Sequence, residues 1–213
     1  MKEVIMQKQV KSMPTVIKER VMRDLIYAQL SFFGFLAIAV VMTSAGFANN
    51  HGLSFYGVHY PTIVPFALGL ILCDFFLLRA AAQLPRSVPP FTTLQPSLWI
   101  ISALLLAILL TPDIVSPLFN TLHIVVSSLL FVFELTLGIW LVVRWDGDIF
   151  TWSLLIAQFL AGIVAMLSQL EVTHYLSQSS LAFQLMFGLL LIWSISRIID
   201  RINAASGKKP SDI

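Results

Sequence analysis

The sequence predicts an all-α polytopic membrane protein, a six-transmembrane-helix bundle with both termini cytoplasmic. Composition is the first observation behind this prediction. The chain of 213 residues is 58% hydrophobic and only 11% charged, whereas a soluble domain carries about 25% charged residues. The charge distribution is the second observation. The 13 Lys and Arg residues lie before the first apolar run, or at and beyond the ends of the second, fourth and sixth runs, and positively charged loops stay in the cytoplasm.

Six apolar runs are expected to cross the bilayer, and all but the third reach the ~17–25 residues that a crossing needs. In chain order the runs are Leu25–Ala48, Pro61–Leu84, Leu98–Leu110, Pro117–Val143, Ile149–Leu170 and Ser180–Ile199. An extended, proline-rich inner loop is expected at Gln83–Ser97, and it leaves the third run short. The third run must still cross, because otherwise Arg144 and the basic C-terminal tail would lie outside.

The chain is organised as one membrane domain with short flanking segments. A basic N-terminal segment covers residues 1–24, the transmembrane domain covers residues 25–199, and a polar cytoplasmic tail covers residues 200–213. The first segment has the apolar spacing of an interfacial helix, and a disordered basic arm is the alternative. Positive charge on one face favours anionic lipids of the cytoplasmic leaflet, so we expect membrane lipids as partners and no nucleic acid.

The expected outer side of the protein carries a different set of residues. All four His residues lie there or just below it: His51, His59, His123 and His174. The first outer loop mixes glycines and aromatics from Gly52 to Gly57, which is typical of a folded cap. The histidine spacings match no zinc-ligand motif, and we predict no metal and no cofactor. Cys73 is the only cysteine, so no intrachain disulfide can form.

The fourth apolar run carries the most informative pattern. Ser116, Asn120, His123, Ser127 and Glu134 recur at spacings of four, three, four and seven residues. At ~100° per residue, this spacing places them on one face of a helix. Polar groups that face acyl chains are costly, so the stripe should face protein or a wet cavity. The alternative is a structural role, in which Asn120 and Ser127 bond neighbouring helices and His123 is a neutral donor.

Two carboxyl groups lie within the apolar runs, Asp74 in the second and Glu134 in the fourth. An ionisable residue at membrane depth indicates a functional site. Arg79 is the nearest basic residue in the sequence and could neutralise either acid, so a buried ion pair is the alternative to a proton or cation site. Gln158 lies among small residues of the fifth run, which favours helix packing with Gln158 bridging to the fourth span.

Catalytic signatures are sparse. The chain contains no His-Glu-x-x-His, Gly-x-Ser-x-Gly or P-loop motif, the patterns that mark metalloproteases, hydrolases and nucleotide-binding enzymes. We therefore predict no catalytic residue. The one metal arrangement that the composition permits is an outer site of His residues with Asp113 or Glu171.

Several short motifs resemble those of a known family. They are the Gly52–Gly57 loop, Thr111-Pro112-Asp113, Asn120-x-x-His123, and Phe131 below them. With these motifs the chain resembles a prokaryotic six-transmembrane family catalogued as a domain of unknown function. More faintly, it is similar to the family that contains the autophagy modulator DRAM and GPI-lipid-remodelling factors. The resemblance covers most of the chain and implies a six-helix fold but no established reaction.

Three functions are compatible with these features. We favour binding or transport of a small molecule or lipid through an outward-facing polar pocket on the fourth span, in a prokaryotic plasma membrane. The alternatives are a membrane-embedded lipid-modifying enzyme, with or without a metal, and a structural or regulatory subunit whose polar stripe only packs helices. The expected ligand-binding residues are Asn120, His123, Ser127, Glu134, Asp74 and Gln158.

Overall fold

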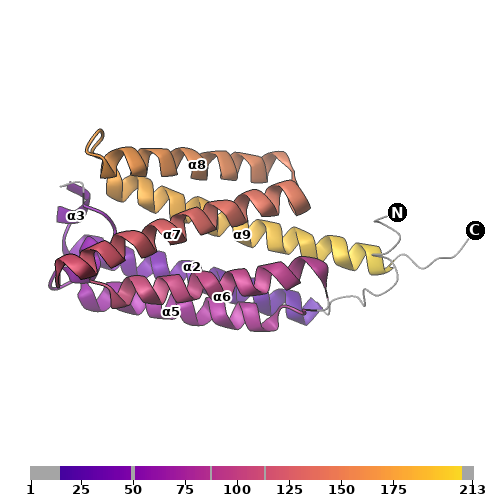
Figure 1. Cartoon of the computed structure of the whole chain (residues 1–213). Coiled ribbons are helices and arrows are strands. Elements are labelled where there is room, and N and C mark those ends of the chain that lie inside the picture. The colour runs from indigo at the N-terminus through magenta and orange to yellow at the C-terminus, as the bar shows by residue number, and fades with distance from the viewer. Residues whose placement is uncertain (1–14, 49–50, 87, 113, 208–213) are drawn as a thin grey trace, which may run out of the picture.

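The computed structural model is a bundle of long helices joined by short turns (Figure 1). It describes residues 15–48, 51–86, 88–112 and 114–207, and these residues contain no strand. Six helices are long and apolar enough to cross a membrane, which confirms the predicted all-α six-span bundle of a multi-pass membrane protein. They are α2 (Thr15–Met42), α5 (Ile63–Gln83), α6 (Pro89–Leu110), α7 (Pro117–Leu141), α8 (Ile149–Gln169) and α9 (Leu176–Gly207).

The two ends of the bundle differ in composition, and we name them accordingly. The basic end, on the right of Figure 1, is where α2 begins and where α5, α7 and α9 end. The histidine end carries two short helices, α3 (Ala45–Ala48) and α4 (Phe55–Val58), and its loops contain His51, His59 and His174. The positive-inside pattern predicts that the basic end lies in the cytoplasm.

The third membrane helix corrects one prediction. α6 begins at Pro89 and spans 22 residues, so the extended loop expected at Gln83–Ser97 is wrong for its second half. Pro89 and Pro90 stand at the first helical positions, where a missing N–H costs no hydrogen bond. Pro96 is accommodated inside the helix. The helix therefore reaches the length that a bilayer crossing needs.

Both terminal membrane helices extend beyond the apolar runs. α2 begins within the basic N-terminal segment, and α9 ends within the polar tail. Lys18 Nζ lies 2.5 Å from Asp200 Oδ1, so an ion pair joins the start of α2 to the end of α9. The predictions for residues 1–14 and 208–213 lie outside the described residues.

Apolar side chains fill the centre of the bundle between closely packed helix pairs. α2 packs extensively against α5, and α8 packs against α9. Gly69 of α5 permits a close approach to α2, because a Cβ at this position would lie 2.8 Å from Phe35 Cβ. The fully buried core includes Leu25, Leu98, Leu141, Leu190 and Ile195. Small residues at crossing points are a common way for membrane helices to approach each other.

A buried carboxylate, Asp24 of α2, organises the basic end. Its side chain is 1% exposed, and Arg79 Nε lies 3.4 Å from its Oδ2 atom. Gln83 donates a hydrogen bond to the same oxygen over 2.6 Å. Arg79 therefore pairs with Asp24, and the expectation that it pairs with Asp74 or Glu134 is wrong. Helical neighbours are three or four residues apart, whereas Arg79 follows Asp74 by five and lies off its face.

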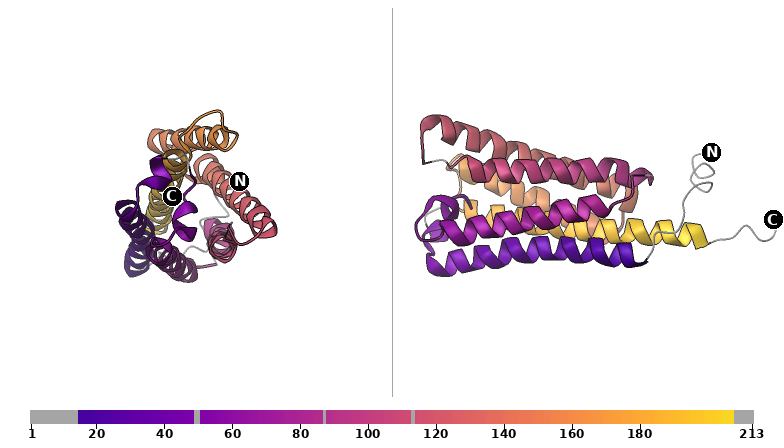
Figure 2. Two further views of the ribbon diagram at one scale, coloured as in Figure 1. Left: turned by 90° about the vertical axis from the view of Figure 1, so that its left-hand side faces the viewer. Right: turned by 90° about the horizontal axis from the view of Figure 1, so that it is seen from below.

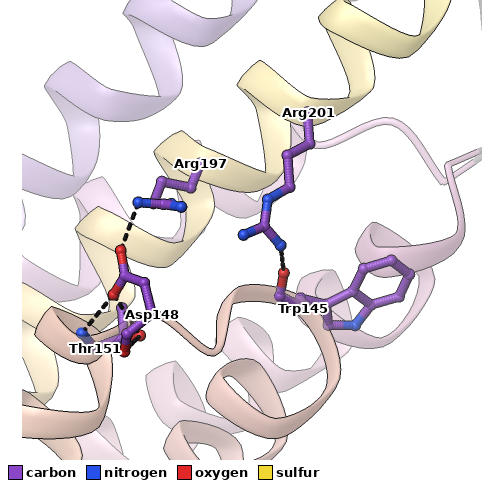
Figure 3. Close-up of polar contacts among 5 residues, drawn as sticks. All are labelled: Trp145, Asp148, Thr151, Arg197 and Arg201. Carbon is purple, nitrogen blue, oxygen red and sulfur yellow. Dashed lines mark hydrogen bonds and ion pairs between the residues drawn. The ribbon is translucent and has the colours of Figure 1, made fainter.

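The turn between α7 and α8 is held to α9 by charged contacts (Figure 3). Asp148 caps the N-terminus of α8 by accepting a hydrogen bond from the backbone N–H of Thr151 over 2.8 Å. Arg197 donates to the other carboxylate oxygen over 2.5 Å. The backbone hydrogen bond from Thr151, and to a smaller extent the Arg197 guanidinium, hold the pKa of Asp148 below its usual range. Asp148 therefore stabilises this end of the bundle as a carboxylate.

A second contact on the same turn involves the irregular end of α7. This helix ends in a π-helical turn, η1 (Val142–Asp146), followed by Gly147 with a φ of 52°. Glycine adopts this left-handed conformation without strain. Arg201 donates a hydrogen bond to the backbone carbonyl of Trp145 in this turn (Figure 3). Charged side chains at the basic end thus join elements that are distant in the sequence.

Candidate ligand-binding cavity

A cavity of about 300 Å³ lies inside the bundle, at the lower end of the size range of small-molecule sites. All six membrane helices contribute side chains to its lining, as does the segment Gly52–Ser54 between α3 and α4. On α7 the lining extends from His123 to Glu134, which is about 16 Å at 1.5 Å per residue. The cavity therefore reaches from the histidine end toward the middle of the bundle.

The start of α7 positions His123. Pro117 is the first helical residue, and Ser116 caps the helix by accepting from the backbone N–H of Phe119 over 3.3 Å. Nearly two turns further on, His123 is 9% exposed and its Nδ1 lies 2.8 Å from the carbonyl oxygen of Thr111. A carbonyl oxygen can only accept, so Nδ1 carries the hydrogen. In the neutral imidazole, Nε2 remains as a hydrogen-bond acceptor.

Glu134 lies at the deep end of the α7 part of the lining, and it is 2% exposed. Gln184 of α9 also lines the cavity, and its Nε2 donates a hydrogen bond to Glu134 Oε2 over 2.8 Å. A carboxylate offers about four acceptor positions. The hydrogen bond from Gln184 therefore leaves acceptor capacity for a bound molecule.

Aromatic rings form much of the apolar part of the lining. The phenylalanines that line the cavity are Phe32, Phe66, Phe131, Phe183 and Phe187. The rings of Phe131 and Phe183 stack with their centroids 4.3 Å apart. Gly162 of α8 makes room for this pair, because a Cβ there would lie 2.4 Å from Phe131 Cζ. Gly162 thus leaves room on α8 for the tip of the Phe131 ring, which comes from α7 and lines the cavity.

The cavity reaches the surface of the bundle between α7 and α8. Ile124 and Ser128 of α7 and Gln169 of α8 line the cavity and are also exposed. From the turn that joins the two helices, α7 diverges from α8 and approaches α6 toward the histidine end (Figure 1, and from two further sides in Figure 2). This side of the bundle would face lipid in a membrane.

The described lining of the cavity contains an acidic side chain but no Lys or Arg. Within the described residues, the titratable groups of the lining are Cys73, His123 and Glu134, and no Lys or Arg is among them. An anion that entered would lose its hydration and gain no opposite charge, which is costly. The lining therefore favours molecules whose polar part is neutral or cationic.

The structure brings half of the predicted site residues to the cavity. His123, Ser127 and Glu134 line it, whereas the described lining does not include Asn120, Asp74 or Gln158. Asn120 is exposed near the start of α7. The expectation that the whole stripe faces the interior is therefore wrong at Asn120, because most side chains at the start of α7 are exposed.

Asp74 and Gln158 are buried at other places in the bundle. Asp74 is 6% exposed and accepts a hydrogen bond from the Ser102 hydroxyl of α6. Gln158 is fully buried beside Gly138, where a Cβ would lie 3.1 Å from its Oε1 atom. Neither the amide nitrogen nor the amide oxygen of Gln158 has a hydrogen-bond partner among the residues that the structure describes. The predicted hydrogen-bonded bridge from Gln158 to the fourth span is therefore not formed.

Sequence reasoning missed Gln184, the partner of Glu134. A usable signal was present, because Ser180 and Gln184 stand four residues apart within the otherwise apolar stretch Ser180–Trp193. The same spacing rule that marked the polar stripe of α7 would have marked this face of α9. Both side chains line the cavity.

The described residues contain no group of three or more His, Cys, Asp or Glu side chains that could hold a metal ion. Comparisons of the chain with family models, with curated proteins and with solved structures found no match. The chemistry of the cavity itself is therefore the basis for assigning a function.

Proposed function

We propose that this protein binds or transports a small amphipathic molecule or lipid in the cavity between its six spans, in a prokaryotic plasma membrane. The observation that supports the proposal is the lining. It combines a polar side, formed by His123, Ser127, Glu134 and Gln184, with apolar and aromatic side chains. A mainly apolar pocket with a few polar groups is the usual character of a small-molecule site.

The place of the opening supports an amphipathic ligand. The exposed lining residues Ile124, Ser128 and Gln169 lie on the half of the bundle near the histidine end. With the basic end in the cytoplasm, this half lies in the outer leaflet. A molecule dissolved in that leaflet enters between α7 and α8 without crossing water, and its polar group then meets the polar side chains of α7.

Photolabelling in lipid nanodiscs tests this proposal. The probe is octanol that carries a diazirine, which inserts into neighbouring side chains on illumination. We expect adducts on the cavity face of α7, at Ser127, Phe131 or Glu134, and we expect excess octan-1-ol to suppress them. Adducts confined to the exposed face of the same helix, at Leu129 and Val132, would contradict the proposal.

A pair of tryptophan variants provides the control. Ser127→Trp adds an indole to the cavity lining, whereas Leu129→Trp adds the same ring two residues away, at a side chain that is 54% exposed. We expect Ser127→Trp to abolish cavity labelling and Leu129→Trp to preserve it. Equal labelling of the two variants would show that the probe does not occupy the cavity.

A further inference from the structure

The charge of the lining narrows the chemical class of the ligand further, and this inference rests on the proposed function. We propose that the polar end of the ligand is a cation, a protonated amine, and that the Glu134 carboxylate binds it. The ligand class is therefore an amphipathic amine, with its apolar part among the phenylalanines of the cavity.

The location of the positively charged side chains of the protein supports this assignment. The described Lys and Arg residues lie at the basic end, where Arg79 pairs with Asp24 and Arg197 pairs with Asp148. None of them is in the described lining, and Glu134 is 2% exposed. A buried carboxylate without a counter-charge is strongly disfavoured. An ammonium group that enters the cavity supplies this charge and donates hydrogen bonds, while Gln184 continues to donate its own.

The surroundings of the carboxyl group also suit a cation. Phe131 precedes Glu134 by one helical turn, and Phe183 adjoins Gln184 in α9. Both rings line the cavity beside these two polar residues. The face of an aromatic ring attracts an ammonium group, more strongly where water is excluded. A carboxylate with aromatic neighbours and no basic residue thus favours an amine over an alcohol, and disfavours a carboxylic acid.

Three competitors with one alkyl chain test the preference. Octylamine, octan-1-ol and octanoic acid compete with the diazirine-bearing octanol for cavity labelling at pH 7, where the amine is cationic and the acid is anionic. Each competitor is measured against wild type and Glu134→Gln in the same nanodiscs, so that partition into lipid cancels. We express the octylamine concentration needed for competition relative to that of octanol, and we expect this ratio to be at least about tenfold lower in wild type than in Glu134→Gln, because hydrogen bonds to charged groups are stronger.

The Glu134→Gln variant should lose the preference and keep the cavity. Its amide oxygen can still accept the hydrogen bond from Gln184, so the packing is preserved. We expect octylamine to compete about as well as octanol in this variant. The concentration of octanol needed for competition should be the same as in wild type. Glu134→Asp retains the charge and should retain a preference for the amine.

Asp74→Asn is the matched control for removing a carboxyl group. Asp74 is also buried in the bundle, but it bonds Ser102 and does not belong to the described lining. We expect this variant to keep the full amine preference. If it loses the preference as Glu134→Gln does, the assignment of the cation to Glu134 is overturned.

The outcomes separate this inference from the proposed function. Cavity labelling that all three competitors suppress equally in wild type would leave the proposed function standing and overturn the amine assignment. Stronger competition by octanoic acid would overturn the assignment as well. The absence of any cavity labelling would overturn the proposed function, and the amine assignment with it.

Discussion

The basic end and the cavity both contain buried carboxyl groups, but the two regions use them differently. At the basic end, the Asp24 side chain is 1% exposed. Its Oδ2 atom lies 3.4 Å from Arg79 Nε and accepts a hydrogen bond from Gln83 Nε2 over 2.6 Å. In the cavity, Glu134 is 2% exposed and bonds Gln184, an uncharged side chain. The first carboxyl group is neutralised by the protein itself, whereas the second retains the capacity to bind a group from outside.

This difference indicates that the basic end stabilises the fold, whereas the cavity is the region that can bind a ligand. Ion pairs at the basic end join α2 to α9 and the α7–α8 turn to α9. Near the histidine end, α7 diverges from α8, and the cavity is open between them. Substitutions at the basic end should therefore change stability and leave ligand binding intact, and substitutions in the cavity should do the reverse.

Arg79→Ala should cause the largest loss of stability. It removes the guanidinium that lies 3.4 Å from Asp24 Oδ2 and leaves Arg23, whose Nε lies 4.0 Å from Oδ1, as the remaining positive charge beside this buried carboxylate. Breaking a fully buried pair costs ~3–5 kcal/mol, and since the Arg79 side chain is 44% exposed, we expect about 2 kcal/mol. The measurement is the free energy of unfolding in detergent.

A second substitution distinguishes charge from packing at this site. Adding Asp24→Asn to Arg79→Ala removes the buried negative charge that has lost its nearer partner, so most of the lost stability should return. Arg20→Ala, at an exposed position on α2, should change stability by less than about 0.5 kcal/mol. If the double variant is no more stable than Arg79→Ala alone, the ion pair is not what stabilises this end.

Asp148→Ala should have the next largest effect. It removes the N-cap of α8, worth ~0.5–2 kcal/mol, and an ion pair at a partly exposed position, worth ~0.2–1 kcal/mol. Asp148→Asn keeps a capping oxygen and loses only the charge, so it should lie between wild type and Asp148→Ala in thermal unfolding. Equal destabilisation by the two variants would assign the whole effect to the ion pair.

Gln158→Met should raise stability. Within the described part of the chain, the buried amide of Gln158 has no hydrogen-bond partner, and a buried unsatisfied polar group costs ~1–3 kcal/mol. Met has a similar length and no such requirement, so a gain of about 1 kcal/mol is expected in the same unfolding assay. Because Gln158 is not in the described lining, labelling of the cavity should not change, and a loss of labelling would give Gln158 a role in binding.

The pH dependence of stability is the smallest expected effect. The pKa of Asp148 is lowered in the folded protein, so its contribution is present above the unfolded value of about 3.9 and is lost as the pH falls through the folded pKa. The stability advantage of wild type over Asp148→Asn should therefore be constant near pH 7 and shrink below about pH 4. An advantage that grows toward acid pH would contradict the lowered pKa.

The sequence predicted the six spans well because length and hydropathy are local properties. It was wrong at α6 because a proline breaks a helix interior but begins a helix at its first positions. Pro89 and Pro90 were interpreted as loop residues, and the structure places them in the first turn.

The cavity was predictable only in part. Periodicity on α7 identified His123, Ser127 and Glu134, which share one face of one helix. The partner of Glu134 lies 50 residues further along the chain, and the partner of Arg79 lies on α2. Such pairings depend on which helices pack together, and the spacing of residues within a single span does not contain that information.

Ligand-induced stabilisation tests the separation of the two regions most directly. Octylamine near 100 times its dissociation constant should stabilise wild type by about 2.7 kcal/mol. Asp148→Asn begins less stable and should gain the same increment, because its change lies outside the cavity. Glu134→Gln should gain at most about 1.4 kcal/mol at the same concentration, because an affinity at least tenfold weaker puts octylamine at no more than about ten times its dissociation constant. Two results would contradict the separation of an ion-paired basic end from a ligand-binding cavity at Glu134. One is a ligand-induced gain in stability in Glu134→Gln equal to that of wild type, and the other is the loss of this gain in Asp148→Asn.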